Sequence, residues 1–178
     1  MGSSRAVLLI SLARLCQSAL AQGSKPLEWQ SADGFVHFTV PAGWYRQDLA
    51  PPSSDPNVVL EVSKSDPGMD QPSARCKVRT QALAAGLTQE EMNRRVHEGV
   101  QGPLKLIAPR VRTVDGVAVV DAVADTPTRE DVQMLFSVVR HGKGNMFSLR
   151  CRRIVGGAIR PADLATMRIF FDTLRISD

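Results

Sequence analysis

The dipeptide Asp115–Gly116 separates two segments of strand-like periodicity, RVRTV before it and VAVVDAVAD after it. Apolar residues that recur with a period of two indicate a β-strand, and Asp-Gly favours the type I′ turn that joins two antiparallel strands. A second pair of such segments, VQMLFSVVR and NMFSLRCRR, flanks the sequence HGKG at 141–144. The chain therefore contains two consecutive predicted hairpins, which restrict it to a fold built on an antiparallel sheet.

Four further strands are predicted before these hairpins. LEWQ and GFVHFTV bracket Ala32, Asp33 and Gly34 and read as a short hairpin. VVLEVSKS and ARCKVRTQ follow, separated by the loop SDPGMDQPS. Strands thus dominate both halves of the sequence.

Two helices are predicted among the strands. Thr88 and Glu91 form a capping box, and Leu87 can pack on Met92, so the first helix begins at Gln89; Gly102 and Pro103 end it. Pro161 suits the first turn of a second helix, whose apolar stripe has helical spacing. The stripe consists of Leu164, Met167, Phe170, Phe171 and Leu174.

The order of these elements predicts an α+β fold, with a mainly antiparallel sheet flanked by helices. Both faces of the segments at 117–124 and 132–139 are apolar. Helices or loops should therefore cover both sides of the sheet, as in an α/β/α sandwich.

The first 21 residues have the features of a signal peptide. Arg5 precedes an apolar run from Ala6 to Leu20, and Ala19 and Ala21 form the small-x-small pattern of a cleavage site after Ala21. A membrane helix is the alternative, but the run contains Arg14 and is shorter than the roughly 20 apolar residues that span a bilayer. Lipid attachment at Cys16 is a second alternative, although the residues before it lack the usual lipoprotein pattern. We expect residues 22–178 to form one periplasmic or secreted domain.

Charge gives little indication of a nucleic-acid partner. The whole chain has a formal charge of +4, and loss of Arg5 and Arg14 leaves 20 basic and 18 acidic residues, or +2. The mature surface is therefore almost balanced. No second apolar stretch is long enough for stable membrane insertion after cleavage.

Two cysteines, Cys76 and Cys151, remain after the predicted cleavage. Each alternates with apolar residues along a predicted strand, so each should lie on the apolar face of the sheet. An even number of cysteines in an oxidising compartment predicts a disulfide between them, with two buried free thiols as the alternative.

Pairing of these cysteines across neighbouring strands would gather five cations on the opposite face of the sheet. These are Arg75, Lys77, Arg79, Arg150 and Arg152. The group is a candidate binding site for a small anion or an acidic partner protein of the envelope. The alternative is a solvated face whose cations pair with acids such as Asp121 or Glu61.

The segment GFVHFTVPAGW resembles the start of PsbP-like domains, in which a strand bearing phenylalanine runs into a proline and then a tryptophan. The match rests on Phe38, Val40, Pro41, Gly43 and Trp44, supported by the order of elements and by the closing FFDTLRIS at 170–177. The resemblance implies that Trp44 anchors the core. An exposed stacking platform of Trp44 and Tyr45 is the alternative. Members of this fold, which include small exported bacterial proteins, mostly act as binding or assembly factors, so the resemblance implies no catalytic residues and no cofactor.

No constellation for catalysis or metal binding is apparent in the residues themselves. The three histidines, His37, His97 and His141, lack ligand-like spacing, and the sequence has neither a nucleophile motif nor a glycine-rich phosphate loop. We therefore expect an exported, non-enzymatic binding or assembly factor in the periplasm. The alternative is a periplasmic hydrolase or transferase with a dispersed site in a cleft between helix and sheet, near the loops at 47–57 and 65–74. It would require strongly shifted pKa values among acids of the cleft or at His141.

Overall fold

The structure is a computed structural model that describes residues 25–47, 55–68, 70–99, 106–126, 129–154 and 158–177. The predicted signal peptide, with its cleavage site after Ala21, lies outside these residues and stays a prediction. The same holds for the assignment of residues 22–178 to one domain. Gly102 and Pro103, which were predicted to end the first helix, are also outside the described residues.

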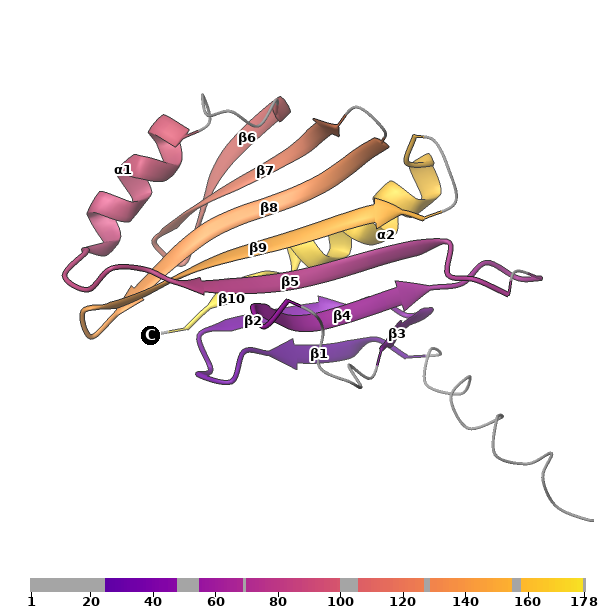
Figure 1. The fold of residues 1–178 in the computed structure, drawn as a ribbon, viewed down its shortest axis with the longest axis horizontal. Coiled ribbons are helices and arrows are strands. Elements are labelled where there is room, and N and C mark those ends of the chain that lie inside the picture. Colours follow the sequence, from indigo (N-terminus) through magenta and orange to yellow (C-terminus); the bar gives the residue numbers. More distant parts are fainter. Residues whose placement is uncertain are drawn as a thin grey trace, which may run out of the picture.

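Strands dominate the described chain, as Figure 1 shows. In chain order the elements are β1 (Leu27–Gln30), β2 (Val36–Val40), β3 (Trp44–Arg46), β4 (Val58–Lys64), β5 (Ala74–Ala82), α1 (Gln89–Gly99), β6 (Leu106–Val114), β7 (Val117–Thr126), β8 (Arg129–Arg140), β9 (Lys143–Arg153), α2 (Pro161–Asp172) and β10 (Arg175–Ile176). The start of α1 at Gln89 and the start of α2 at Pro161 are as predicted.

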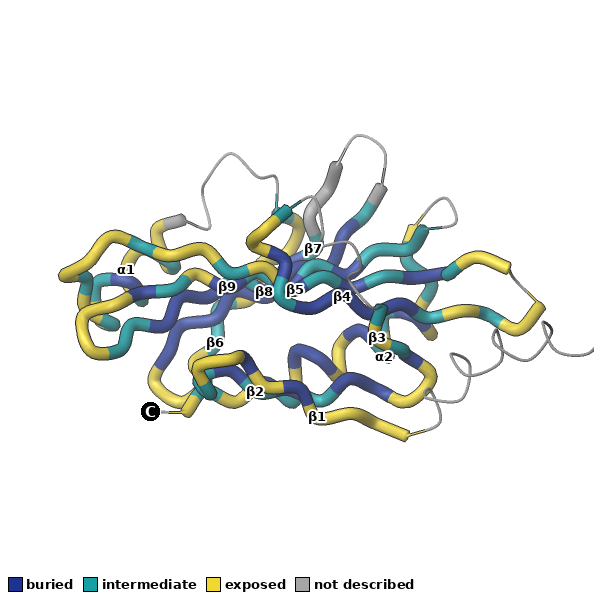
Figure 2. The backbone as a smooth tube through the Cα atoms, turned by 60° about the horizontal axis from the view of Figure 1, so that its bottom comes forward, coloured by how far each residue is buried: buried dark blue, intermediate teal, exposed yellow. Residues whose placement is uncertain are grey.

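The strands form two antiparallel sheets. The larger sheet has seven strands in the order β3-β4-β5-β9-β8-β7-β6, and the smaller has three in the order β1-β2-β10. Helix α1 packs on one face of the large sheet, over β7 and β8, while α2 and the small sheet lie on the other face (Figure 2). The predicted α+β class with helices on both sides is confirmed, but the separate small sheet was not predicted.

The core lies between the large sheet and the layer that contains α2 and the small sheet. Phe170 of α2 packs edge-on against Phe38 and Trp44, with ring centroids 5.8 and 5.3 Å apart, and Trp29 stacks on Phe38 at 4.7 Å. Trp44 is only 3% exposed. The prediction that Trp44 anchors the core is therefore confirmed, and its burial is incompatible with an exposed stacking platform.

Helix α1 is held at its first turn by polar contacts. The hydroxyl of Thr88 accepts a hydrogen bond from the backbone N–H of Glu91 at 3.2 Å, which is the first half of a capping box. The Glu91 carboxylate bonds to Arg94 and Arg95 instead of completing the box. The side chain of Gln89 donates to the carbonyl of Ser137 and accepts from the N–H of Val139, so it fixes the helix to β8.

Two-residue turns close both central hairpins. Asp115 and Gly116 have φ values of 47° and 81°, as the predicted type I′ turn requires, and His141 and Gly142 have φ values of 48° and 71°. The second turn was predicted to span HGKG at 141–144. It is shorter because Lys143 and Gly144 already pair with Arg140 and Val139 in the β8–β9 ladder.

Replacing Gly116 with alanine is expected to lower the free energy of unfolding by about 1 kcal/mol, because an L-residue in a left-handed conformation is strained by roughly that amount. A Cβ atom at Gly116 would meet no heavy atom within 4 Å, so the loss would be conformational and not steric. Urea unfolding of Gly116→Ala measures the effect. Gly116→Asn is the matched control, because asparagine tolerates this conformation and should lose less. Equal stability of Gly116→Ala and the native protein would contradict the prediction.

Candidate functional site

The predicted disulfide sets the geometry of the candidate site. Cys76 of β5 and Cys151 of β9 are directly opposite in the ladder, with their Cα atoms 4.1 Å apart and their sulfur atoms bonded. Both side chains are fully buried. Because side chains alternate along a strand, the neighbours of both cysteines point to the other face of the large sheet.

The structure brings the five predicted cations together on that other face. Lys77 is opposite Arg150 and Arg75 is opposite Arg152, with Arg79 two residues beyond Lys77 on β5. We call these five residues and the two acids among them the charged face. Its members are Arg75, Lys77, Arg79, Arg150, Arg152, Glu61 and Asp131.

Carboxylates already contact most of the cations of the charged face. Glu61 of β4 pairs with both Arg75 and Lys77, at 3.0 and 2.9 Å. Arg150 lies 3.6 Å from Asp131 of β8. Outside the charged face, Asp55 pairs with Arg79 at 2.8 Å. Arg152 also has an interaction partner.

One predicted pairing is right and one is wrong. Glu61 does neutralise cations of the charged face, but Asp121 lies on the opposite face of the sheet. There Asp121 accepts hydrogen bonds from Arg110 and Arg112 of β6, at 3.0 and 2.8 Å. The reason is the register of β7 against β8, which places Asp121 opposite Met134, a core residue.

The charged face remains accessible to a partner. The side chains of Arg75, Lys77, Arg79 and Arg150 keep between 27 and 43% of their surface exposed. Helix α1 covers β7 and β8, and no described helix covers the charged residues of β5 and β9. One carboxylate, that of Glu61, serves two cations, so an added anion can compete for them.

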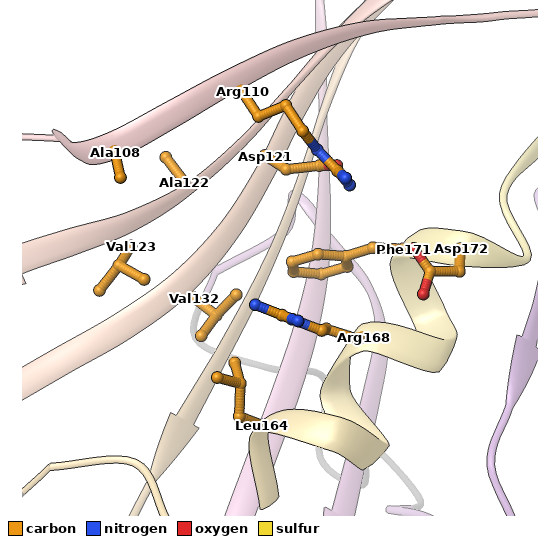
Figure 3. A pocket seen from close by; sticks show the side chains of 10 residues that line it. All are labelled: Ala108, Arg110, Asp121, Ala122, Val123, Val132, Leu164, Arg168, Phe171 and Asp172. Atoms are coloured by element: carbon orange, nitrogen blue, oxygen red, sulfur yellow. The ribbon is translucent and has the colours of Figure 1, made fainter. Parts of the chain in front are cut away.

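A cleft opens on the opposite face of the large sheet, between α2 and the strands β6 and β7 (Figure 3). The cavity has a volume of about 300 Å³. Its walls combine apolar side chains with charged residues, among them Arg110 of β6 and Arg168 of α2. A cleft between a helix and the sheet was predicted, but near the loops at 47–57 and 65–74. The residues that line this one lie within 108–172, and the sequence did not indicate them because its two walls are distant in the chain.

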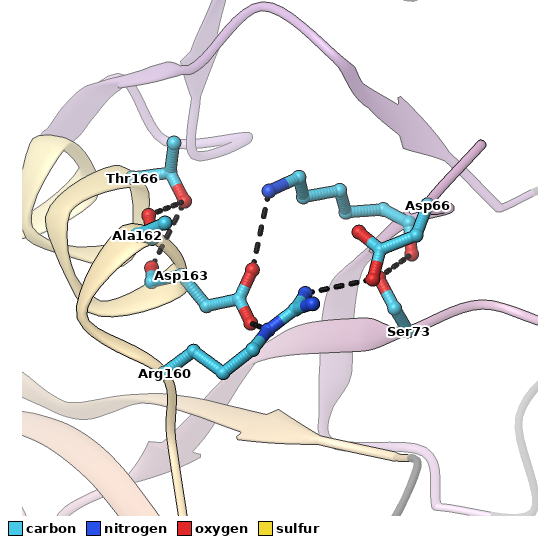
Figure 4. Close-up of polar contacts among 7 residues, drawn as sticks. Asp66, Ser73, Arg160, Ala162, Asp163 and Thr166 are labelled. Carbon is cyan, nitrogen blue, oxygen red and sulfur yellow. Dashed lines mark hydrogen bonds and ion pairs between the residues drawn. The ribbon is translucent and has the colours of Figure 1, made fainter.

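A buried carboxylate in the first turn of α2 links this helix to the large sheet. Asp163 is completely buried and accepts hydrogen bonds from Lys64 at 3.2 Å and from Arg160 at 2.7 Å. Arg160 in turn donates to Asp66 at 2.7 Å, so it lies between two carboxylates (Figure 4). Burial by itself raises the pKa of Asp163, but the hydrogen bonds from Arg160 and Lys64 outweigh it and hold that pKa below its ordinary value.

Several solved structures resemble this chain in fold, although they share little sequence identity with it. No protein-family model matches the sequence, and no curated protein is significantly similar to it. LpqN of Mycobacterium tuberculosis, described as involved in cell envelope biogenesis, superimposes with a TM-score of 0.57 at 10% identity, over 86% of this chain and 91% of that protein. CyanoP, the cyanobacterial PsbP of Synechocystis, superimposes with a TM-score of 0.53 at 15% identity, over 86% of this chain and 94% of that protein. The chain has a PsbP-like fold.

Within this PsbP-like fold the three histidines stay apart. His37 Nε2 lies 2.8 Å from the carbonyl oxygen of Gly34, and His97 and His141 are exposed on α1 and at a hairpin tip. Among the described residues, no three His, Cys, Asp or Glu side chains are grouped as a metal site would need. None of the described helices combines the length and the apolar character that crossing a bilayer requires.

The pKa shifts bear on the hydrolase or transferase alternative. A carboxyl group that acts as a general acid near neutral pH needs a raised pKa. The described carboxyl groups with shifted pKa values are Asp66, Glu91 and Asp163, and all three are shifted downward by hydrogen bonds from basic side chains, Glu91 to about 2. Such groups stay ionised as partners of cations. The part of the predicted cleft at 48–54 lies outside the described residues.

Proposed function

We propose that this protein is an exported, non-enzymatic binding or assembly factor of the cell envelope, and that its charged face holds an anionic partner. The observation that carries the proposal is the gathering of five cations on adjacent strands, where one carboxylate is shared by two of them. Long arginine and lysine side chains on a sheet face can exchange an internal carboxylate for one from a partner.

The fold and the disulfide support this proposal. LpqN, which has the same fold, is described as involved in cell envelope biogenesis. Disulfides form and persist in oxidising compartments, so the Cys76–Cys151 bond is compatible with an exported protein. The predicted signal peptide at 1–21 would direct the chain to the periplasm or out of the cell.

Loss of three cations from the charged face is expected to weaken binding to anionic probes about tenfold. Each Lys or Arg near an anionic surface contributes about 1 kcal/mol to the binding free energy. We expect competition from the internal carboxylates to halve the contribution of the three cations to about 1.5 kcal/mol, which corresponds to about tenfold in affinity. The variant is Lys77→Gln, Arg79→Gln and Arg150→Gln together. The probes are immobilised polyglutamate and vesicles of phosphatidylcholine with and without phosphatidylglycerol, at low and physiological salt.

The matched control removes three exposed cations elsewhere, Lys25, Arg46 and Lys143, again by glutamine. It changes the net charge equally but leaves the charged face intact, so its binding should equal that of the native protein. Equal weakening in both variants would show that binding follows net charge alone, and failure of the native protein to bind either probe would refute the anionic partner. Circular dichroism confirms that each variant is folded.

A further inference from the structure

The cleft beside α2 has an apolar interior. Val123 of β7, Val132 of β8, and Leu164 and Phe171 of α2 line it, and their side chains point toward a common space in Figure 3. A water molecule occupies about 30 Å³ of the liquid, so a cavity of about 300 Å³ holds about ten non-hydrogen atoms. Val132 and Phe171 are already buried, and a ligand of that size with an apolar body would remove the exposed parts of Val123 and Leu164 from water.

Arg168 gives the cleft a positive charge without an internal partner. It is exposed on α2, it makes no hydrogen bond or ion pair with the described residues, and in Figure 3 its guanidinium group points into the space near Val132. Arginine usually pairs in such a position, since its planar group offers two parallel donors to a carboxylate. The Arg168 side chain therefore presents an unused anion-binding group beside an apolar wall.

The two acids of the cleft do not cancel this charge. Asp121 is engaged by two arginines, Arg110 and Arg112. Asp172 is exposed and acts on Arg110, whose pKa is raised by its hydrogen bond with Asp121 and further by the charge of Asp172. Two arginines and two aspartates line the cleft, and Arg112 behind it also pairs with Asp121. Three arginines thus share two carboxylates, and Arg168 forms an ion pair with neither of them.

A β-bulge shapes the opposite wall. The register of β6 against β7 shifts between Ile107 and Arg110, and Ala108 within the shift has a left-handed φ of 46°. Ala108 lines the cavity, where its small side chain leaves room. Bulges and residues held in left-handed conformations are concentrated at binding sites, where they redirect side chains such as that of Arg110.

We propose that this cleft binds a small organic anion that has one carboxylate on an apolar body and about ten non-hydrogen atoms in all. The carboxylate accepts two hydrogen bonds from Arg168, and the body packs on Val123, Val132, Leu164 and Phe171. This site lies on the face of the large sheet opposite the charged face. The two sites share no residue, so either can fail without the other.

Octanoate has the required charge and size and is the first probe. Calorimetric titration of the purified protein is expected to give a dissociation constant on the order of 0.1 to 1 mM, which is typical of a ligand this small. Amide NMR signals of Val123, Leu164 and Phe171 should shift on binding. 3-Phenylpropanoate distinguishes an aromatic from an aliphatic body, whereas octanol lacks the charge and acetate lacks the body, so both should bind at least tenfold more weakly.

Arg168→Gln is expected to weaken octanoate binding about tenfold or more, because a hydrogen bond to a charged group contributes enough for that factor. Arg46→Gln, which removes an exposed arginine at the far edge of the large sheet, is the matched control and should bind as the native protein does. Val123→Phe should fill the cavity and abolish binding while Arg168 remains. Equal binding of octanol and octanoate, unchanged binding by Arg168→Gln, or NMR shifts confined to residues outside the cleft would each refute the proposal.

Discussion

Loss of the Cys76–Cys151 disulfide is expected to lower the free energy of unfolding by about 4 to 5 kcal/mol, since the bond closes a long loop and restricts the unfolded chain. The two cysteines are 75 residues apart, and the segment between them contains α1 and the strands β6, β7 and β8. Both residues are fully buried, so replacement by alanine also removes the packing of two sulfur atoms, which adds to the loss of the cross-link. Reduction of the native protein breaks the cross-link and keeps the sulfur atoms, so it separates the two effects.

Urea unfolding of the oxidised native protein and of Cys76→Ala/Cys151→Ala measures this difference. Treatment of the native protein with a reductant should shift its midpoint toward that of the double variant, while the double variant itself should not respond. If the reductant shifts both proteins equally, the effect does not arise from this bond.

Replacement of Asp163 with alanine is expected to destabilise the protein by about 3 kcal/mol, because removal of one partner from a buried ion pair leaves the other charges uncompensated. Lys64 and Arg160 retain 22 and 41% of their side-chain surface, so water compensates them in part, which places the loss at the lower end of the usual range. Asp172→Ala is the matched control. It removes an exposed aspartate from the last turn of the same helix and should cost nothing, since an acid near a helix C-terminus is not stabilising.

Acid should remove the contribution of Asp163 in the native protein. Because its folded-state pKa lies below the ordinary value of 3.8, the stabilisation is complete above that pH and is lost as the pH falls through the folded-state pKa. The difference in stability between the native protein and Asp163→Ala should therefore be constant near neutral pH and shrink below pH 3.8. A difference that does not change with pH would mean that packing, and not charge, accounts for the loss.

The charged face was predictable because it depends on a single register. Once Cys76 and Cys151 are paired, alternation along β5 and β9 places all five cations on the other side of the sheet. The hairpin at Asp115–Gly116 was predictable for a similar reason, since two adjacent residues determine its turn. Local signals also located the first turns of α1 and α2.

Asp121 shows what alternation alone does not determine. Its face depends on the register of β7 against β8, and a shift of one residue would have moved it to the charged face. The burial of Asp163 was equally hidden, because its partner Lys64 is 99 residues away. The cleft beside α2 depends on a bulge in β6 and on the placement of α2, and neither leaves a signal in the sequence.

The pairing of β10 with β2 has a consequence for how the chain folds. Residues 175 and 176 complete a sheet that begins near the start of the described chain, and the N–H of Thr39 bonds to the hydroxyl of Thr173, 134 residues later. The hairpins of the large sheet can form from local contacts, whereas the small sheet must wait for the slow closure of a very long loop. The hairpin of β1 and β2 can pair locally, but in a chain released N-terminus first Phe38 stays without its partner Phe170 until α2 arrives. The arrival of residues 170–176 therefore decides when the small sheet is complete and its aromatic side chains are covered.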